Sequence, residues 1–122
     1  MKTPKISIVD DDRIVREAIS DFVQSCGYSP FTFASAEEFL ASGQVAETAC
    51  LITDLQMQGL DGLDLQEHLL QKGHRTPIIF ISAFPRANAR ERALNAGAIA
   101  FLSKPFKEMT LLSAIKSALA IS

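Results

Sequence analysis

The chain lacks several features that would indicate particular classes of protein. Its formal net charge is only −2, so the charge balance favours neither nucleic acid nor an anionic membrane as a partner. Its two cysteines, Cys26 and Cys50, form no pair motif and no metal-ligand spacing, which indicates two reduced thiols. No apolar run approaches the roughly 18 residues of a membrane span, and the N-terminal residues do not resemble a signal peptide. We therefore expect a cytoplasmic protein that makes no contact with a membrane.

The motifs of several enzyme classes are missing as well. There is no glycine-rich phosphate-binding loop and no Ser/His/Asp arrangement. The two histidines, His68 and His74, have no partner at the spacing of a metal site or a catalytic triad, so we expect both to be solvated. At 122 residues, with 48% apolar and 21% charged residues and no linker or repeat, the chain fits one folded domain over residues 1–122.

Short apolar runs alternate with segments of helical spacing along the chain. The predicted strands are 5–9, 29–33, 49–53, 78–81 and 99–102, and the predicted helices are 13–26, 35–43, 63–72, 86–96 and 106–120. We expect Ile14, Leu70 and Met109 on the inward faces of their helices. Ser35 and Glu38 predict a capping box. The alternation of strands and helices predicts a doubly wound α/β fold, a parallel five-stranded sheet with helices on both faces.

Polar and charged residues stand where four of these strands end. They are Asp10, Asp11 and Asp12 after the first strand, Asp54 after the third, Ser82 after the fourth and Lys104 after the fifth. The carboxyl ends of parallel strands meet at one edge of the sheet, which is where ligands bind in such folds. Converging carboxylates repel one another unless a cation joins them, and oxygen ligands that leave positions for water suit Mg²⁺.

The chemistry that these groups permit is phosphoryl transfer. We expect Asp54 to be a carboxylate nucleophile that accepts a phosphoryl group, with Mg²⁺ and Lys104 supplying positive charge and Ser82 a hydrogen bond. The simpler alternative is that the first aspartates only cap a helix and that Asp54 is a solvated loop residue. Capping needs one aspartate rather than three, and it does not account for Asp54.

The combined pattern resembles the receiver domain of two-component response regulators over essentially the whole chain. Its motifs are Asp10-Asp11-Asp12, Asp54, Ser82-Ala83 and Lys104-Pro105-Phe106. Residues 33–40 and 97–106 look most like the FixJ-type subgroup. The resemblance implies a flavodoxin-like (βα)5 fold with strand order 2-1-3-4-5. It also implies a signalling domain that catalyses only its own phosphorylation and dephosphorylation, rather than an enzyme.

The resemblance further implies a role for each residue of the site. Asp54 takes a phosphoryl group from a phosphohistidine on a sensor histidine kinase. The Mg²⁺ ligands are Asp10 (through a water molecule), Asp11, Asp54 and the backbone carbonyl of Gln56. Phosphoryl binding and switching fall to Ser82, Ala83, Lys104 and Phe101, with Phe101 swinging inward behind Ser82 and Pro105 following a cis peptide bond. The phosphorylated domain dimerises through its fourth helix, fifth strand and fifth helix, and DNA is bound only by an output domain that these residues do not include.

The sequence departs from the family pattern at two places near the phosphoacceptor. Met57-Gln58 stands where Met-Pro is usual, and Phe84-Pro85 stands where smaller or polar residues are frequent. Our hypothesis is that Gln56 and Phe84 screen the acyl phosphate from water and slow its hydrolysis.

Three alternative functions fit the sequence less well than a receiver domain does. A haloacid dehalogenase-type phosphatase would use Asp10 as nucleophile, but Ile14 stands where the motif of that family requires Thr or Val. Of the acidic pair that the family carries beyond its lysine only Glu108 is present, and the chain has no room for a cap domain. A flavin-binding module would place a phosphate beside three aspartates that repel it. A degenerate receiver used only for protein contact would not need the complete set of Asp11, Asp54, Ser82 and Lys104.

Overall fold

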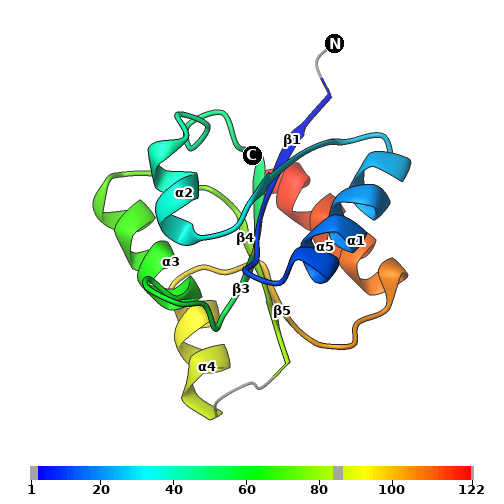
Figure 1. The fold of residues 1–122 in the computed structure, drawn as a ribbon. Coiled ribbons are helices and arrows are strands. Elements are labelled where there is room, and N and C mark those ends of the chain that lie inside the picture. Colours follow the sequence, from blue (N-terminus) through cyan, green and yellow to red (C-terminus); the bar gives the residue numbers. More distant parts are fainter. Residues whose placement is uncertain (1–2, 84–86, 122) are drawn as a thin grey trace.

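The computed structural model describes residues 3–83 and 87–121, and in them five strands alternate with five helices (Figure 1). The strands are β1 (Lys5–Val9), β2 (Ser29–Phe33), β3 (Cys50–Asp54), β4 (Ile78–Ser82) and β5 (Ala100–Ser103). The helices are α1 (Arg13–Ser25), α2 (Ala36–Ala41), α3 (Gly62–Gln71), α4 (Ala87–Asn95) and α5 (Glu108–Ile121). The strands form one sheet of order β2-β1-β3-β4-β5, and every neighbouring pair is parallel. The predicted fold class and strand order are confirmed.

The helices cover both faces of the sheet, α1 and α5 on one side and α2, α3 and α4 on the other (Figure 1). Successive side chains of a strand point to opposite faces, so each strand contributes to two hydrophobic clusters. Beneath α1 and α5 the sheet presents a layer of isoleucines, and beneath α2 to α4 it presents larger and more varied side chains such as Leu51, Phe80 and Phe101. All residues of β3 and β4 are buried, which explains their continuous apolar runs.

The capping box forms at a different helix from the one predicted. Ser35 caps α2 by accepting a hydrogen bond from the Glu38 N–H, but the Glu38 carboxylate accepts from the Ala34 N–H instead of reaching back to Ser35. A reciprocal box opens α3, where the side chains of Asp61 and Asp64 each accept from the other's backbone N–H at 2.8 and 3.1 Å. This box fixes the start of α3 shortly after β3 ends.

The predicted inward positions of three apolar residues are wrong. Ile14 is 79% exposed and Met109 72% exposed, and Leu70 also faces solvent. In α5, the residues against the sheet are Leu111, Ala114, Ile115 and Ala118, while Met109 lies in the first turn, off the buried stripe. The apolar spacing therefore identified these helices but did not fix which of their apolar residues face the sheet. Among the described residues no helix has both the length and the apolar character needed to cross a membrane.

Candidate functional site: an acidic edge with one lysine

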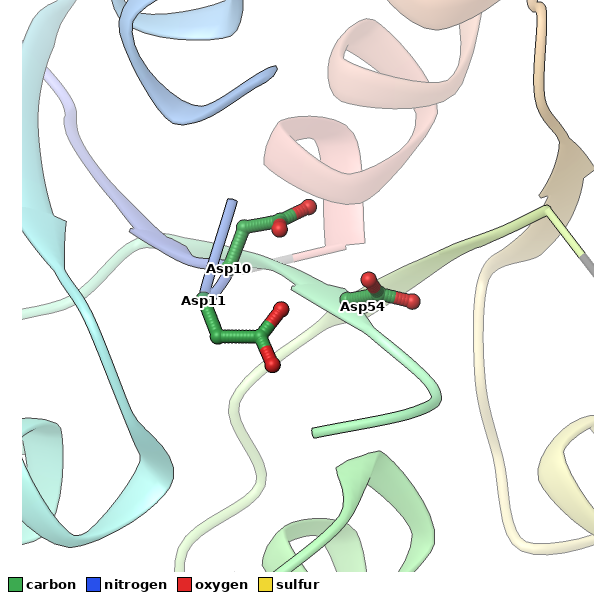
Figure 2. Close-up of side chains that lie close together, drawn as sticks. All are labelled: Asp10, Asp11 and Asp54. Carbon is green, nitrogen blue, oxygen red and sulfur yellow. The ribbon is translucent and has the colours of Figure 1, made fainter. Parts of the chain in front are cut away.

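Three carboxylates meet at the carboxyl edge of the sheet (Figure 2). β1 and β3 are neighbours in the sheet, with Val9 opposite Thr53, so Asp10 and Asp54 emerge side by side. Asp11 follows Asp10 and turns its carboxylate toward the same place (Figure 2). One oxygen from each of the three lies within 4.8 Å of the others, and this is the one such group within residues 3–83 and 87–121. An all-oxygen set of this kind, with two ligands buried and Asp11 exposed to water, suits a hard divalent cation.

Asp10 is fixed at several of its atoms. Its N–H donates to the carbonyl of Phe33 at the end of β2 (3.2 Å), and its Oδ1 accepts from the Asp12 N–H (2.8 Å). Its carbonyl accepts from Nη1 of Arg16 (2.6 Å). Burial raises the pKa of the Asp10 carboxyl above its usual range, although the Asp12 N–H and Lys104 oppose the rise. The ionised form of Asp10 is therefore disfavoured unless a cation lies close to the carboxylate.

Lys104 is the cation that the chain itself supplies to this edge. Its Nζ lies 3.1 Å from Oδ2 of Asp54 and 3.3 Å from Oδ2 of Asp10, and its side chain is 17% exposed. Burial alone would lower the pKa of Lys104, but the hydrogen bond to Asp54 and the charges of Asp10 and Asp54 outweigh that effect and raise it. The group is a permanent ammonium at neutral pH. The peptide bond that joins it to Pro105 is cis.

Asp54 is the last residue of β3, so the rigid sheet holds its backbone. Its Oδ1 accepts from the Gln56 N–H at 3.2 Å, and its Oδ2 contacts Lys104. Gly62 lies directly against the Asp54 backbone, because a Cβ at this position would be 2.5 Å from the Asp54 carbonyl oxygen and 2.9 Å from the Phe80 ring. The first turn of α3 can therefore approach the end of β3 this closely only with glycine at this position.

The remaining predicted site residues lie on β4 and β5. Ser82 is fully buried at the end of β4, and its carbonyl accepts from the Lys104 N–H at 2.8 Å, whereas Ala83 is exposed. Phe101 is already turned inward in this structure, buried and stacked on Phe80 with 6.0 Å between ring centroids. Phe84 lies outside the described residues.

Two residues of the site were missed from the sequence. The sequence places Arg16 only within the helix predicted over residues 13–26, although a helical side chain leans toward the N-terminus and can reach the residues before the cap. The cap itself is Asp12, which accepts from the Ile14 and Val15 N–H groups. Gly62 directly precedes the helix predicted over residues 63–72, and no sequence motif marks it. Its close approach to Asp54 depends on how α3 packs, which the sequence around it does not reveal.

Comparison with known proteins places the chain in one family. The model of the response regulator receiver domain matches residues 6–116. The response regulator protein TodT of Pseudomonas putida is 43% identical over 117 residues, which cover 96% of this chain and 52% of TodT. The structure of response regulator StyR superposes with a TM-score of 0.90 and 40% identity over 98% of this chain and 60% of StyR. FixJ-N superposes with a TM-score of 0.88 and 30% identity, covering 98% of this chain and 96% of FixJ-N.

The chain spans about half the length of the curated relatives that it matches. These relatives include transcriptional regulatory proteins named FixJ, which are 29–30% identical to it. The resemblance noted in the sequence is thus confirmed: the chain belongs to the receiver domains of two-component response regulators and is similar to those of the FixJ type.

Proposed function

We propose that this chain is the phosphoacceptor of a two-component system and that Asp54 carries the phosphoryl group. The observation that carries the proposal is the position of the Asp54 carboxylate, which has an oxygen within 4.8 Å of oxygens of Asp10 and Asp11 and lies 3.1 Å from the Lys104 ammonium group. A lone carboxylate is a poor nucleophile toward an anionic phosphoryl group, because like charges repel. Cationic groups beside it remove that barrier.

The donor set fits Mg²⁺. Asp11 and Asp54 would hold the ion, with the backbone carbonyl of Gln56, and Asp10 would act through a coordinated water molecule. Bound there, Mg²⁺ would supply positive charge to the equatorial oxygens of the phosphoryl group. A cation bound there would also favour the ionised form of Asp10, whose pKa is raised by burial and by the charge of Asp54.

The transfer step begins with a phosphohistidine on a sensor histidine kinase. An oxygen of the Asp54 carboxylate bonds to phosphorus while the bond from phosphorus to the imidazole nitrogen breaks. The bonding electron pair goes to that nitrogen, and because the other ring nitrogen carries a proton, the histidine leaves as a neutral imidazole. Lys104 exchanges its contact with Asp54 for one with a phosphoryl oxygen, and Ser82 and the exposed Ala83 backbone contact another oxygen. The product is an acyl phosphate on Asp54.

The phosphorylated site then acts on the surface formed by α4, β5 and α5. Within the described side chains, α4 buries only Ala89 and Ala93, and the side-chain amide of Gln66 on α3 donates to the Ala93 carbonyl at 3.0 Å. A helix held by so few contacts can move at small cost, and phosphorylation would bias its position by drawing Ser82 toward the new oxygens and holding Phe101 inward. We propose that this surface forms a homodimer and controls an output domain, which would bind DNA to regulate transcription.

The lifetime of the signal depends on access of water to the acyl phosphate. We propose that Gln56 and Phe84 limit that access. Two observations support this role for Gln56: its N–H donates to the Asp54 carboxylate, and the residue is exposed. Phe84→Ala should then speed dephosphorylation at constant Mg²⁺, and an unchanged rate would remove Phe84 from the proposal.

The decisive experiment is incubation with Mg²⁺ and acetyl phosphate, followed by intact-mass measurement. We expect one phosphoryl adduct, which is absent in Asp54→Ala and in the presence of EDTA. No adduct on the wild-type chain would contradict the proposal and favour a degenerate receiver. Release of phosphate that depends on Asp10, in Asp10→Asn compared with Asp54→Asn, would instead favour the phosphatase.

A further inference from the structure

Arg16 connects α1 to the acidic edge through the backbone. Its Nη1 donates to the carbonyl oxygen of Asp10 at 2.6 Å, a short bond between a charged donor and a peptide acceptor. Its own N–H donates to the Asp12 carbonyl at 2.9 Å, so Arg16 lies within the first turn of α1. The rigid start of the helix therefore holds the carbonyl from a fixed position.

The bonded carbonyl belongs to the peptide that joins Asp10 to Asp11. A peptide unit is planar, so the direction of its C=O fixes the orientation of the whole unit and the point from which the Asp11 side chain departs. Asp10 has further restraints, from the Phe33 carbonyl and the Asp12 N–H. Asp11 has none of its own among residues 3–83 and 87–121, since its exposed side chain makes no hydrogen bond or ion pair there. The direction of the Asp11 carboxylate thus depends on the peptide that Arg16 holds.

We propose that Arg16 is a positioning residue for the divalent cation, because it fixes the Asp10–Asp11 peptide and so aims Asp11 at the oxygens of Asp10 and Asp54. This inference rests on the proposed metal site. Without the bond, the peptide turns more freely, and the cation must order it on binding at a cost in conformational entropy. Arg16 does not contact the cation.

The charge of Arg16 acts in the opposite sense to its hydrogen bond. A guanidinium near the site repels a divalent cation, so loss of the charge alone would tighten cation binding. Loss of the hydrogen bond would weaken it. The direction of the change in affinity therefore distinguishes positioning from simple electrostatics.

Arg13 provides a matched control one turn away. It is an exposed arginine that pairs with Glu17 at 3.0 Å and makes no contact with the acidic edge. Arg13→Met removes the same charge from the same end of α1 without touching the Asp10–Asp11 peptide.

The test measures Mn²⁺ affinity by electron paramagnetic resonance, without any phosphodonor. The Mn²⁺ dissociation constant of Arg16→Met should rise about 10-fold, as it does when other residues that orient metal ligands without touching the metal are removed. Arg13→Met should bind Mn²⁺ as tightly as the wild type or slightly more tightly. Arg16→Lys should lie between Arg16→Met and the wild type, because its ammonium reaches one atom less far. An affinity of Arg16→Met equal to or tighter than the wild type would overturn the inference.

Two further readouts keep the outcome unambiguous. At saturating Mg²⁺, the phosphorylation rate of Arg16→Met with acetyl phosphate should return toward the wild-type rate, which a merely structural defect would not do. If Arg16→Met does not fold, Arg16→Lys decides the question, and wild-type affinity in that variant would overturn the inference. A wild-type chain that binds no Mn²⁺ would refute the proposed metal site as well, whereas normal binding by both the wild type and Arg16→Met would refute only the role of Arg16.

Discussion

Lys104→Met removes the cation that the chain places between Asp10 and Asp54. The two carboxylates lose contacts of 3.3 and 3.1 Å and stay behind in a largely buried site. Removing one partner of a fully buried ion pair costs about 3–5 kcal/mol, and an exposed pair is worth about 0–1 kcal/mol. With the lysine side chain 17% exposed, the variant should lose about 2–3 kcal/mol in the free energy of unfolding in the absence of metal. For a chain of 122 residues this corresponds to a fall of about 10 °C in Tm.

The assay is thermal and urea unfolding in EDTA, repeated with Mg²⁺. Because the cation replaces the missing positive charge, Mg²⁺ should stabilise Lys104→Met more than the wild type and reduce the difference between them. Lys116→Met, at an exposed position on α5, is the matched control and should unfold within about 0.5 kcal/mol of the wild type. A Lys104→Met chain that is as stable as the wild type in EDTA would refute the view that Lys104 neutralises the acidic edge.

Other expected outcomes concern pH, packing and thiol reactivity. Because burial raises the pKa of Asp10, the folded state binds its proton more strongly than the unfolded state, so metal-free stability should fall as pH rises through the range above 3.8. Asp10→Asn should reduce that dependence, raise stability at pH 7 in EDTA and weaken Mg²⁺ binding, as acid titrations of unfolding and calorimetry can show. Gly62→Ala should cost about 1–3 kcal/mol in urea unfolding, since its Cβ would clash with the Asp54 carbonyl. Burial raises the pKa of the Cys50 thiol to about 12, so iodoacetamide at pH 8 should leave it unlabelled in the folded chain and label it in urea, with half-buried Cys26 as the internal comparison.

The sheet and the acidic edge could be predicted because both depend on short, local patterns. Each apolar run that ends in an aspartate, a serine or a lysine marks the carboxyl end of a strand, and parallel strands bring those ends together. Pro30 lies in β2, at the edge of the sheet, where a strand tolerates a residue that has no backbone N–H. Helix boundaries shifted by one or two residues; the last helix begins at Glu108 rather than Phe106.

The errors and omissions arise where one element meets another. Ile14 and Met109 have helical spacing, but which apolar residues face inward depends on where the sheet lies. The same holds for two contacts at the site. No local pattern encodes the bond from Arg16 to the Asp10 carbonyl, or the approach of Gly62 to Asp54 that leaves no space for a Cβ, because both depend on contacts between elements. The inward position of Phe101 depends on its stacking with Phe80, its partner on the neighbouring strand β4, and the sequence around either residue does not reveal it.

The hydrogen bond from Gln66 to Ala93 is one of the few contacts that hold α4 in its resting position. The Ala93 carbonyl accepts from both the Gln66 amide and the Ala98 N–H, which closes the C-terminal end of α4. Apart from these bonds, two buried alanines hold the described part of the helix. On the proposed function, the displaced arrangement of α4 would therefore lie only a few kcal/mol above the resting one. At such a gap the unphosphorylated domain would occupy the displaced arrangement about 0.1–10% of the time. On the proposed function, that fraction would be background output in the absence of any stimulus, and weakening the bond from Gln66 to Ala93 would raise it.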